Sequence, residues 1–362
     1  MRVAVVGTGY VSNQYAPTLK SEGARLVCHD VDPGRQHEFA VHWDAEEAAD
    51  LTSLTGLDLA AAVNLTPPMV HAGVTRELLE LGIPVYSEKP LAYTLERGRA
   101  LAYLSATGGV PLACAPDTIL GESEQLLRAF VDRGLVGRPL WINAAHTHRG
   151  HELWHPRPHF FFRPGAGPIF DVGPYWIAAM VNLVGPVSAV TASGYTPDLE
   201  RLFRDEDGSV TNIEVNVATS CGLLLEFESG PRASLLLSYD LFLSDAPTLE
   251  IIGDEGVLMV REPLYRGQGP VLHRARTDQN WSLPPDPPSA QPWRRGIGVL
   301  EFVRSIGTGR RSRLDAVFAL HALAVMEAAK VSLETGRRMP VSCGLPTGRP
   351  DPMLDGSDDL AA

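Results

Sequence analysis

Apolar positions near the start of the chain follow the periods of strands and helices in turn. Residues 2–6 form a short apolar run, residues 13–21 repeat with helical spacing, and residues 25–30 form a second apolar run. Strand-like and helical segments keep alternating up to residue 113. This alternation predicts an α/β unit with a doubly wound, parallel sheet.

The pattern changes after residue 119, where strand-like segments follow one another with turn residues and without crossover helices. Sequential strands predict an α+β unit with a large, mostly antiparallel open sheet, one face of which is covered by a helix that begins near Asp171. Two late helices, at residues 297–306 and 315–335, complete this unit. The strands are predicted at residues 139–145, 187–193, 213–219, 223–228, 233–239 and 249–252.

Composition narrows the class of protein. Hydrophobic residues make up 44% of the 362 residues, and no apolar run reaches the roughly 18 residues that a membrane span requires. The net charge of −12, without a basic cluster, argues against nucleic acid and membrane as partners. The first residues lead directly into a strand and leave no room for a signal peptide, so we expect a cytoplasmic protein with its four cysteines reduced and buried.

The sequence GTGYVS, residues 7–12, lies between a predicted strand and a predicted helix. Gly7 permits a tight turn, and Gly9 lets the backbone approach a pyrophosphate, with Tyr10 and Val11 beside it. The motif therefore predicts a dinucleotide site of the Rossmann type.

Asp30 ends the next strand at the spacing at which a carboxylate binds ribose hydroxyls. This carboxylate favours NAD, because it repels the 2′-phosphate of NADP. Arg35 lies close enough in sequence to bind that phosphate, so NADP remains open.

Two loops follow later strands of the same unit and should face the edge at which an open α/β sheet binds its ligand. In NLTPP, residues 64–68, we expect Leu65, Thr66 and Pro67 to border the nicotinamide ribose. His71 belongs either to this site or to an ordinary turn before a helix, and both interpretations remain open.

The second loop, SEKP, should bring Glu88 and Lys89 to the same edge. The usual explanation of adjacent opposite charges is a surface ion pair. However, only three of the 31 basic residues are lysines, and arginine cannot replace lysine in proton transfer. Position and scarcity together favour a functional Lys89.

The stretch GAGPIFDVGPYWIAAMV, residues 165–181, combines loose glycines with an apolar helix. Asp171 and Tyr175 are four residues apart, which places them on one helical face with Cβ atoms about 5 to 6 Å apart. A carboxylate can orient a substrate hydroxyl, and a phenol near an ammonium can take up its proton. The alternative is a helix cap and a buried ring, which leaves the glycines of this stretch unexplained.

Five of the eleven histidines lie in residues 146–165. His151, His155 and His159 have helical spacing, but prolines between them interrupt any helix, so no metal site is predicted. We expect a loop that lines the substrate site, although part of it can equally be a solvated surface loop. Its predicted substrate contacts are Trp154, Arg157, His159 and Arg163.

The motifs GTGYVS, NLTPP, SEKP and GAGPIFDVGPY, in this order, resemble the glucose-fructose oxidoreductase, inositol dehydrogenase and MocA family of nicotinamide-dependent oxidoreductases. The similarity extends over nearly the whole chain. It implies that Lys89, Asp171 and Tyr175 act at the hydride-transfer site. Many members have histidine in place of Tyr175, whereas the glucose-fructose oxidoreductase and dihydrodiol dehydrogenase branches have tyrosine, which weakens an inositol assignment.

The resemblance implies NAD(P)-dependent interconversion of a secondary alcohol and a ketone on a sugar, sugar derivative or cyclitol, by a homodimer or homotetramer. Two rivals are a dinucleotide-binding, sugar-sensing regulator without catalysis, and an enzyme that retains NADP(H) and passes hydride between two sugars. The expected domains are a dinucleotide-binding domain at residues 1–121, a substrate-binding and oligomerisation domain at 122–345, and a disordered tail at 346–362.

Overall fold

The computed structural model describes residues 1–205, 207–241, 249–260, 271–285, 287–288 and 292–353. The chain divides into two units. The first unit comprises Met1–Leu120, Trp293–Leu323 and Cys343–Asp351, and the second comprises Gly121–Pro292, Ala324–Ser342 and the residues from Pro352 onward. Most of the tail predicted to be disordered, residues 354–362, lies outside the described residues.

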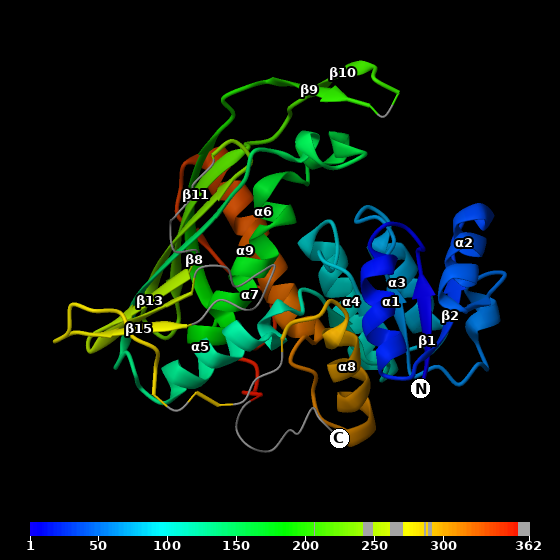
Figure 1. Ribbon diagram of the computed structural model, residues 1–362, viewed down its shortest axis with the longest axis horizontal. Helices are drawn as coiled ribbons and strands as arrows, with labels where there is room; N and C mark the ends of the chain where they lie inside the picture. The colour runs from blue at the N-terminus through cyan, green and yellow to red at the C-terminus, as the bar shows by residue number, and fades with distance from the viewer. Residues whose placement is uncertain (206, 242–248, 261–270, 286, 289–291, 354–362) are drawn as a thin grey trace. The chain divides into compact units, whose positions relative to one another are not determined.

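The first unit contains a six-stranded sheet in the order β3-β2-β1-β4-β5-β6, and every neighbouring pair is parallel. The predicted doubly wound sheet is therefore confirmed (Figure 1). Its central strands are short apolar runs buried on both faces, as parallel strands covered by helices must be. The elements are β1 (Arg2–Val6), α1 (Ser12–Ser21), β2 (Arg25–His29), α2 (Pro33–Trp43), β3 (Glu46–Glu47), β4 (Ala61–Asn64), α3 (His71–Glu80), β5 (Val85–Ser87), α4 (Leu95–Gly108) and β6 (Leu112–Cys114).

Helix α8 (Ile297–Thr308) belongs to the first unit, although the sequence placed it in the second domain. The cause is Asp117, a buried carboxylate beyond β6. It accepts hydrogen bonds from Trp293 Nε1 at 3.0 Å and from the backbone N–H groups of Gly296 at 2.8 Å and Gly298 at 3.2 Å. These bonds fix the start of α8 to the end of the parallel sheet.

The second unit contains an eight-stranded sheet in the order β15-β14-β13-β7-β12-β11-β8-β16. Among the described strands, β7 and β12 form a parallel pair and the other neighbours are antiparallel, so the predicted mostly antiparallel sheet is confirmed. The strands are β7 (Pro139–Thr147), β8 (Val187–Tyr195), β11 (Ser220–Phe227), β12 (Arg232–Ser238), β13 (Leu249–Gly253), β14 (Gly256–Val260), β15 (Leu272–Ala275) and β16 (Met339–Pro340).

The strand predicted at residues 213–219 is placed differently. Residues Val210–Glu214 form β10, which pairs with β9 (Glu200–Arg204) in a separate two-stranded sheet. In β9, the side chains of Arg201 and Phe203 are buried, whereas Leu202 between them is exposed. This hairpin therefore has one inward face and one solvent face.

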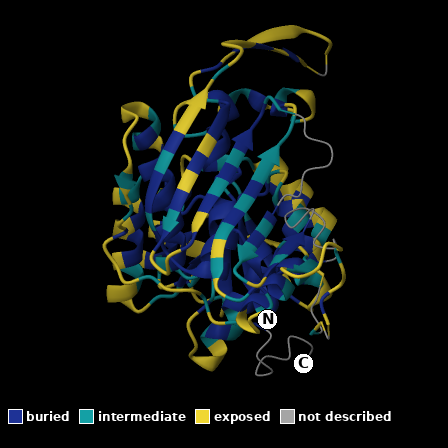
Figure 2. Cartoon of the chain, turned by 90° about the vertical axis from the view of Figure 1, so that its left-hand side faces the viewer, coloured by how far each residue is buried: buried dark blue, intermediate teal, exposed yellow. Residues whose placement is uncertain are grey.

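Helices cover one face of the large sheet. They include α6 (Gly167–Asp171), α7 (Gly173–Val184) and α9 (Ala316–Thr335), whose Ser332 hydroxyl accepts a 2.8 Å bond from the N–H of Ala192 in β8 (Figure 1). Figure 2 shows the opposite face, on which buried residues alternate with exposed and half-buried ones. Helix α9 is apolar and long enough to cross a membrane by composition alone, but 67% of its apolar window is buried, as in a core helix.

Candidate active site

Gly7 follows β1 with a φ angle of +90°, in the region that favours glycine. A Cβ atom at this position would lie 2.8 Å from the backbone nitrogen of Thr66 and 2.9 Å from the carbonyl carbon of Leu65. The glycine turn and the NLTPP loop therefore touch through their backbones. Any side chain at position 7 would push these two loops apart.

The N-terminus of α1 fits the pyrophosphate of a dinucleotide. The ten-residue helix has no side-chain hydrogen bond at its N-cap, so its first N–H groups are not capped by a side chain. A Cβ atom at Gly9 would meet nothing within 4 Å, which leaves space beside the backbone. Ser12 is 1% exposed and bonds to the Gly9 carbonyl at 2.6 Å, so it closes the turn against the helix.

Asp30 is anchored to the glycine turn. Its Oδ2 accepts a 2.7 Å bond from the N–H of Thr8, and its Oδ1 accepts a 2.9 Å bond from the N–H of Asp32. Arg35 is paired with two carboxylates, at 3.0 Å from Asp32 Oδ2 and 3.6 Å from Asp30 Oδ1. Asp30, which is predicted to bind ribose, is thus fixed beside the turn. The guanidinium of Arg35, which could bind the 2′-phosphate of NADP, is paired with two carboxylates.

His71 connects the two loops that follow β4 and β5. Its Nδ1 lies 3.0 Å from the carbonyl oxygen of Pro90, and its Nε2 lies 2.5 Å from that of Thr66. The ring is 1% exposed, and this burial lowers the pKa of His71. Asn64 supports the same region by accepting bonds from the N–H and hydroxyl of Thr66 at 3.2 and 2.6 Å.

Glu88 holds the backbone of Lys89. Its Oε2 accepts a 2.8 Å bond from the Lys89 N–H, and its Oε1 accepts bonds from the Tyr15 hydroxyl at 2.8 Å and from Arg295 at 3.0 Å. Burial alone would raise the pKa of Glu88, but the positive charges of Arg295 and Lys89 outweigh burial and lower it. Sequence reasoning missed Arg295, although the segment RRGIG contains it.

In the second unit, the parallel pairing of β7 and β12 brings the residues that follow both strands to one edge. Thr147 pairs with Ser238, and the N–H of His148 donates to the Ser238 carbonyl at 3.0 Å. Beyond this point, the rings of His148 and His151 lie 4.8 and 4.6 Å from the ring of Tyr239. Parallel strands end at the same edge, so residues far apart in sequence meet here.

Asp171 has a hydrogen bond and a close polar contact at this edge. Its Oδ2 lies 3.0 Å from the hydroxyl of Tyr239 and 3.1 Å from Nε2 of His151. The Asp171 side chain is 17% exposed. Sequence reasoning placed Asp171 in the site but missed both of these partners.

The helix predicted to carry Asp171 and Tyr175 together is interrupted. Helix α6 ends at Asp171 and α7 begins at Gly173. Pro174 has no N–H with which to continue the helical ladder, and the Tyr175 N–H bonds instead to Val172 at 3.2 Å. The two side chains thus belong to successive helices. Asp171 does not cap α7, which has no side-chain cap bond, and Tyr175 is 8% exposed.

The histidine-rich segment forms two short 3₁₀ turns, η3 (His151–Leu153) and η4 (Pro158–Phe162), so its histidines do not share one helix. Of the predicted substrate contacts, Trp154 is 61% exposed, Arg157 and Arg163 are exposed, and the His159 ring lies 5.8 Å from Phe203. His151 is the member of this segment that contacts Asp171. Burial, with the neighbouring His151 and His146, lowers the pKa of His148 to about 3.

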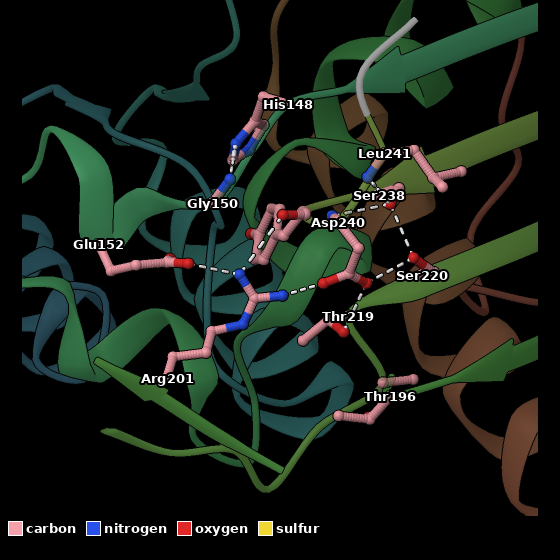
Figure 3. A network of polar contacts seen from close by, with 12 residues as sticks. His148, Gly150, Glu152, Thr196, Arg201, Thr219, Ser220, Ser238, Asp240 and Leu241 are labelled. Atoms are coloured by element: carbon pink, nitrogen blue, oxygen red, sulfur yellow. Dashed lines mark hydrogen bonds and ion pairs between the residues drawn. The ribbon is translucent and has the colours of Figure 1, made fainter. Parts of the chain in front are cut away.

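A buried network of charges lies beside this edge (Figure 3). Arg201 of β9 donates to Glu152 Oε1 at 2.6 Å and also to Asp240 Oδ1. Asp240 Oδ2 in turn accepts the hydroxyls of Thr219 at 2.7 Å and Ser220 at 2.6 Å. The three charged side chains are 8 to 9% exposed, so their charges are compensated within the protein.

Two family models match the chain. Residues 1–115 match an oxidoreductase family with an NAD-binding Rossmann fold, and residues 125–259 match the Gfo/Idh/MocA C-terminal domain. Together they span Gly7, Asp30, Lys89, Asp171 and Tyr175.

Relatives and solved structures agree with this assignment. A myo-inositol dehydrogenase, Hyg17, of Streptomyces leeuwenhoekii is 38% identical over 38% of this chain and 43% of its own. An inositol 2-dehydrogenase of Rhodococcus erythropolis is 25% identical over 94% of this chain and 95% of its own. A levoglucosan dehydrogenase solved with NADH and L-sorbose has a TM-score of 0.80 at 19% identity, over 94% of this chain and 99% of that chain, and shows the same fold.

The matches to Hyg17 and to three other curated relatives span about half of those proteins, between 43% and 56% of their length. The two family models, in contrast, account for the consecutive domains of this chain. The chain belongs to the Gfo/Idh/MocA family of oxidoreductases, and its first domain is an NAD-binding Rossmann domain.

Proposed function

We propose that this protein is an NAD-dependent dehydrogenase that interconverts a secondary alcohol and a ketone on a sugar, sugar derivative or cyclitol. The observation that carries the proposal is the carboxylate of Asp171, held by Tyr239 and His151 at the end of α6, in a chain whose first domain is an NAD-binding domain. The substrate class is supported by the names of the relatives, which include inositol dehydrogenases and a levoglucosan dehydrogenase.

In this proposal, the turn at Gly7 and Gly9 and the first N–H groups of α1 hold the pyrophosphate of NAD. Asp30 binds a ribose, and the backbone at Leu65, Thr66 and Pro67 borders the nicotinamide. Bound NAD supplies the hydride acceptor for oxidation. Tyr10, Val11, His71 and Glu88 remain predicted members of the cofactor site.

The chain supplies the positioning and the proton transfer. Asp171 accepts a hydrogen bond from a substrate hydroxyl and so orients the reacting carbon. Tyr175 takes up the proton of the reacting hydroxyl, and the ammonium of Lys89 stabilises the oxygen from which that proton leaves. The exposed ring of Trp154 suits packing on a sugar ring, and Arg157, His159 and Arg163 remain predicted polar contacts.

The test is a turnover assay on the purified chain, with NAD⁺ or NADP⁺ and a panel of myo-inositol, scyllo-inositol, levoglucosan and glucose, followed by nicotinamide absorbance. We expect turnover with NAD⁺ on at least one panel compound. Dinucleotide binding without turnover on any compound would contradict the proposal and favour a sensing regulator. Cofactor that stays bound through gel filtration would favour hydride exchange between two sugars.

We also propose that the enzyme acts in the cytoplasm as a homodimer or homotetramer, formed through the open face of the eight-stranded sheet. Leu224 of β11 is 51% exposed and alternates with the buried Leu223 and Leu225, so it lies on the open face of this sheet (Figure 2). Light scattering on the wild-type chain and on Leu224→Arg tests the assembly. A wild-type chain that is monomeric at micromolar concentration would contradict it.

A further inference from the structure

We infer that His151 is a positioning residue that holds Asp171 in one orientation, and that Arg201 fixes the two chain segments that supply the donors to Asp171. The inference rests on the proposed role of Asp171 in orienting the substrate. It concerns residues that lie outside the motifs that carry the family resemblance.

The direction of the hydrogen bond follows from chemistry. A carboxylate oxygen only accepts, so Nε2 of His151 must carry a hydrogen where it lies 3.1 Å from Asp171 Oδ2. The other ring nitrogen, Nδ1, is buried and has no hydrogen-bond partner among the described residues. Asp171 is thus the polar anchor of this imidazole.

The surrounding rings fix the plane of the imidazole. It stacks on Phe161 with ring centroids 3.6 Å apart and meets Tyr239 edge to face at 4.6 Å. His151 itself is 4% exposed. The packing thus fixes the ring plane, and the contact with Asp171 sets which ring nitrogen faces the carboxylate.

Two donors on one oxygen restrict the carboxylate more than either donor alone. His151 comes from η3 and Tyr239 follows β12, so the bonds reach Oδ2 from separate segments. Rotation of the Asp171 carboxylate would break both contacts. The direction in which Asp171 presents its other oxygen is thereby set.

Arg201 acts on both donors at once. Glu152 follows His151 in sequence, and Asp240 follows Tyr239. The same guanidinium binds both acids, as Figure 3 shows (Figure 3). It also lies near the backbone carbonyl of Tyr239, at 3.5 Å. One side chain of β9 therefore connects the two segments that carry the donors.

The first test compares His151→Leu with His151→Gln, because the amide of glutamine can replace the Nε2 donor and leucine cannot. The substrate is the panel compound that the wild type turns over fastest. We expect His151→Leu to lower kcat roughly 10²-fold, the scale of a misplaced substrate. His151→Gln should recover at least tenfold of that loss. The dissociation constant for NADH should stay within twofold in both variants.

His155→Leu is the matched control. It is the same substitution in the same segment, and the His155 ring also packs on Phe161, at 5.1 Å, but its Nδ1 accepts from the N–H of Arg157. We expect kcat within twofold of the wild type. Wild-type kcat in His151→Leu, or equal losses in His151→Leu and His151→Gln, would overturn the inference.

A second measurement separates this inference from the proposed function. In full-length protein labelled with ¹⁵N-histidine, the neutral His151 ring should carry its hydrogen on Nε2, and Asp171→Ala should shift the Nε2 resonance because it removes the acceptor. A hydrogen on Nδ1 in the wild type overturns the inference whether or not any panel compound reacts. If no compound reacts, the proposed function fails, and the ¹⁵N spectrum alone decides whether His151 holds Asp171.

Discussion

The candidate residues of the two units are held in different ways. In the first unit, the loops after β1, β4 and β5 are fixed largely through backbone groups, as at Gly7 and at the two carbonyls that contact His71. In the second unit, Asp171 is held by side chains from distant segments, which are themselves held by Arg201. The dinucleotide is a constant ligand, so its site can rely on backbone contacts. A substrate site that is held by side chains can change through substitutions of those side chains, while the sheet beneath it stays the same.

The largest effect on stability is expected from the buried ion pairs of Arg201 in the second unit. Arg201→Met leaves Glu152 and Asp240 buried without a counter-charge and should lower the free energy of unfolding by about 3 to 5 kcal/mol. Denaturant unfolding measures the loss. Arg338→Met, which removes an exposed partner of Glu226, is the control and should leave the midpoint nearly unchanged. Equal midpoints for both variants would contradict the role of the network.

The chemistry should depend on Tyr175 and Lys89. Tyr175→Phe removes the proposed base and should lower turnover by roughly 10²-fold or more, the usual scale of general acid–base catalysis. Lys89→Met should lower it at least as much. Steady-state kinetics and NADH titration measure the two effects, and the NADH dissociation constant should not change. Near-normal turnover of Tyr175→Phe would place the base elsewhere.

Two buried carboxylates, Glu124 in the second unit and Glu88 in the first, allow the comparison to be tested through the pH dependence of the free energy of unfolding. Burial raises the pKa of Glu124 to about 8, and neither of its oxygens has a hydrogen-bond partner among the described residues. The folded state therefore binds its proton more tightly than the unfolded chain, in which the pKa is near 4.5. The free energy of unfolding should then fall as the pH rises from about 4.5 to about 8.

Glu124→Gln removes this loss. At pH 8 the variant should be more stable than the wild type by about 4 kcal/mol, because each pH unit between the two pKa values costs roughly 1.4 kcal/mol, and at pH 4.5 the two should be nearly equal. The paired positive charges lower the pKa of Glu88, so Glu88→Gln should have the opposite sign and destabilise the first unit at neutral pH. Denaturant midpoints of both proteins should be measured across this pH range. If the midpoint of Glu124→Gln followed the wild-type pH dependence, the raised pKa of Glu124 would be refuted.

The smallest effect concerns the backbone contact in the first unit. Gly7→Ala adds an atom 2.8 Å from Thr66 N and should weaken NADH binding about tenfold, by moving two loops apart. Gly23→Ala has a similar positive φ of +73° but would meet nothing within 4 Å. Titration should therefore show unchanged NADH affinity for Gly23→Ala. Equal affinities for the two variants would show that the contact at Gly7 has no influence on the site.

Sequence reasoning worked where the information is local. The glycine turn, the parallel sheet and the apolar α7 follow from short stretches of residues, and the turn was readable from the spacing of Gly7, Gly9 and Asp30. The sequence also carries a signal for the break before α7, because Pro174 follows Gly173 and proline is common at the first position of a helix.

The remainder depends on contacts that no local pattern records. Asp117 draws the segment from Trp293 back to the first unit through bonds that span 176 to 181 residues. The partners of Asp171 come from residues 151 and 239, which meet because β7 and β12 pair in parallel inside an otherwise antiparallel sheet. A sequence that predicts hairpins gives no sign of such a pair.

This parallel pair also bears on the order in which the chain folds. Asn143 and Ser234 are joined by a 2.8 Å hydrogen bond across 91 residues. Strand β7 can therefore pair with β12 only after the long segment between them has been synthesised. Closing so large a loop is slow compared with forming the nearby contacts of a strand, helix and strand. During synthesis, the strands and helices of residues 2–114 can therefore gain structure while the edge around Asp171 is still unformed.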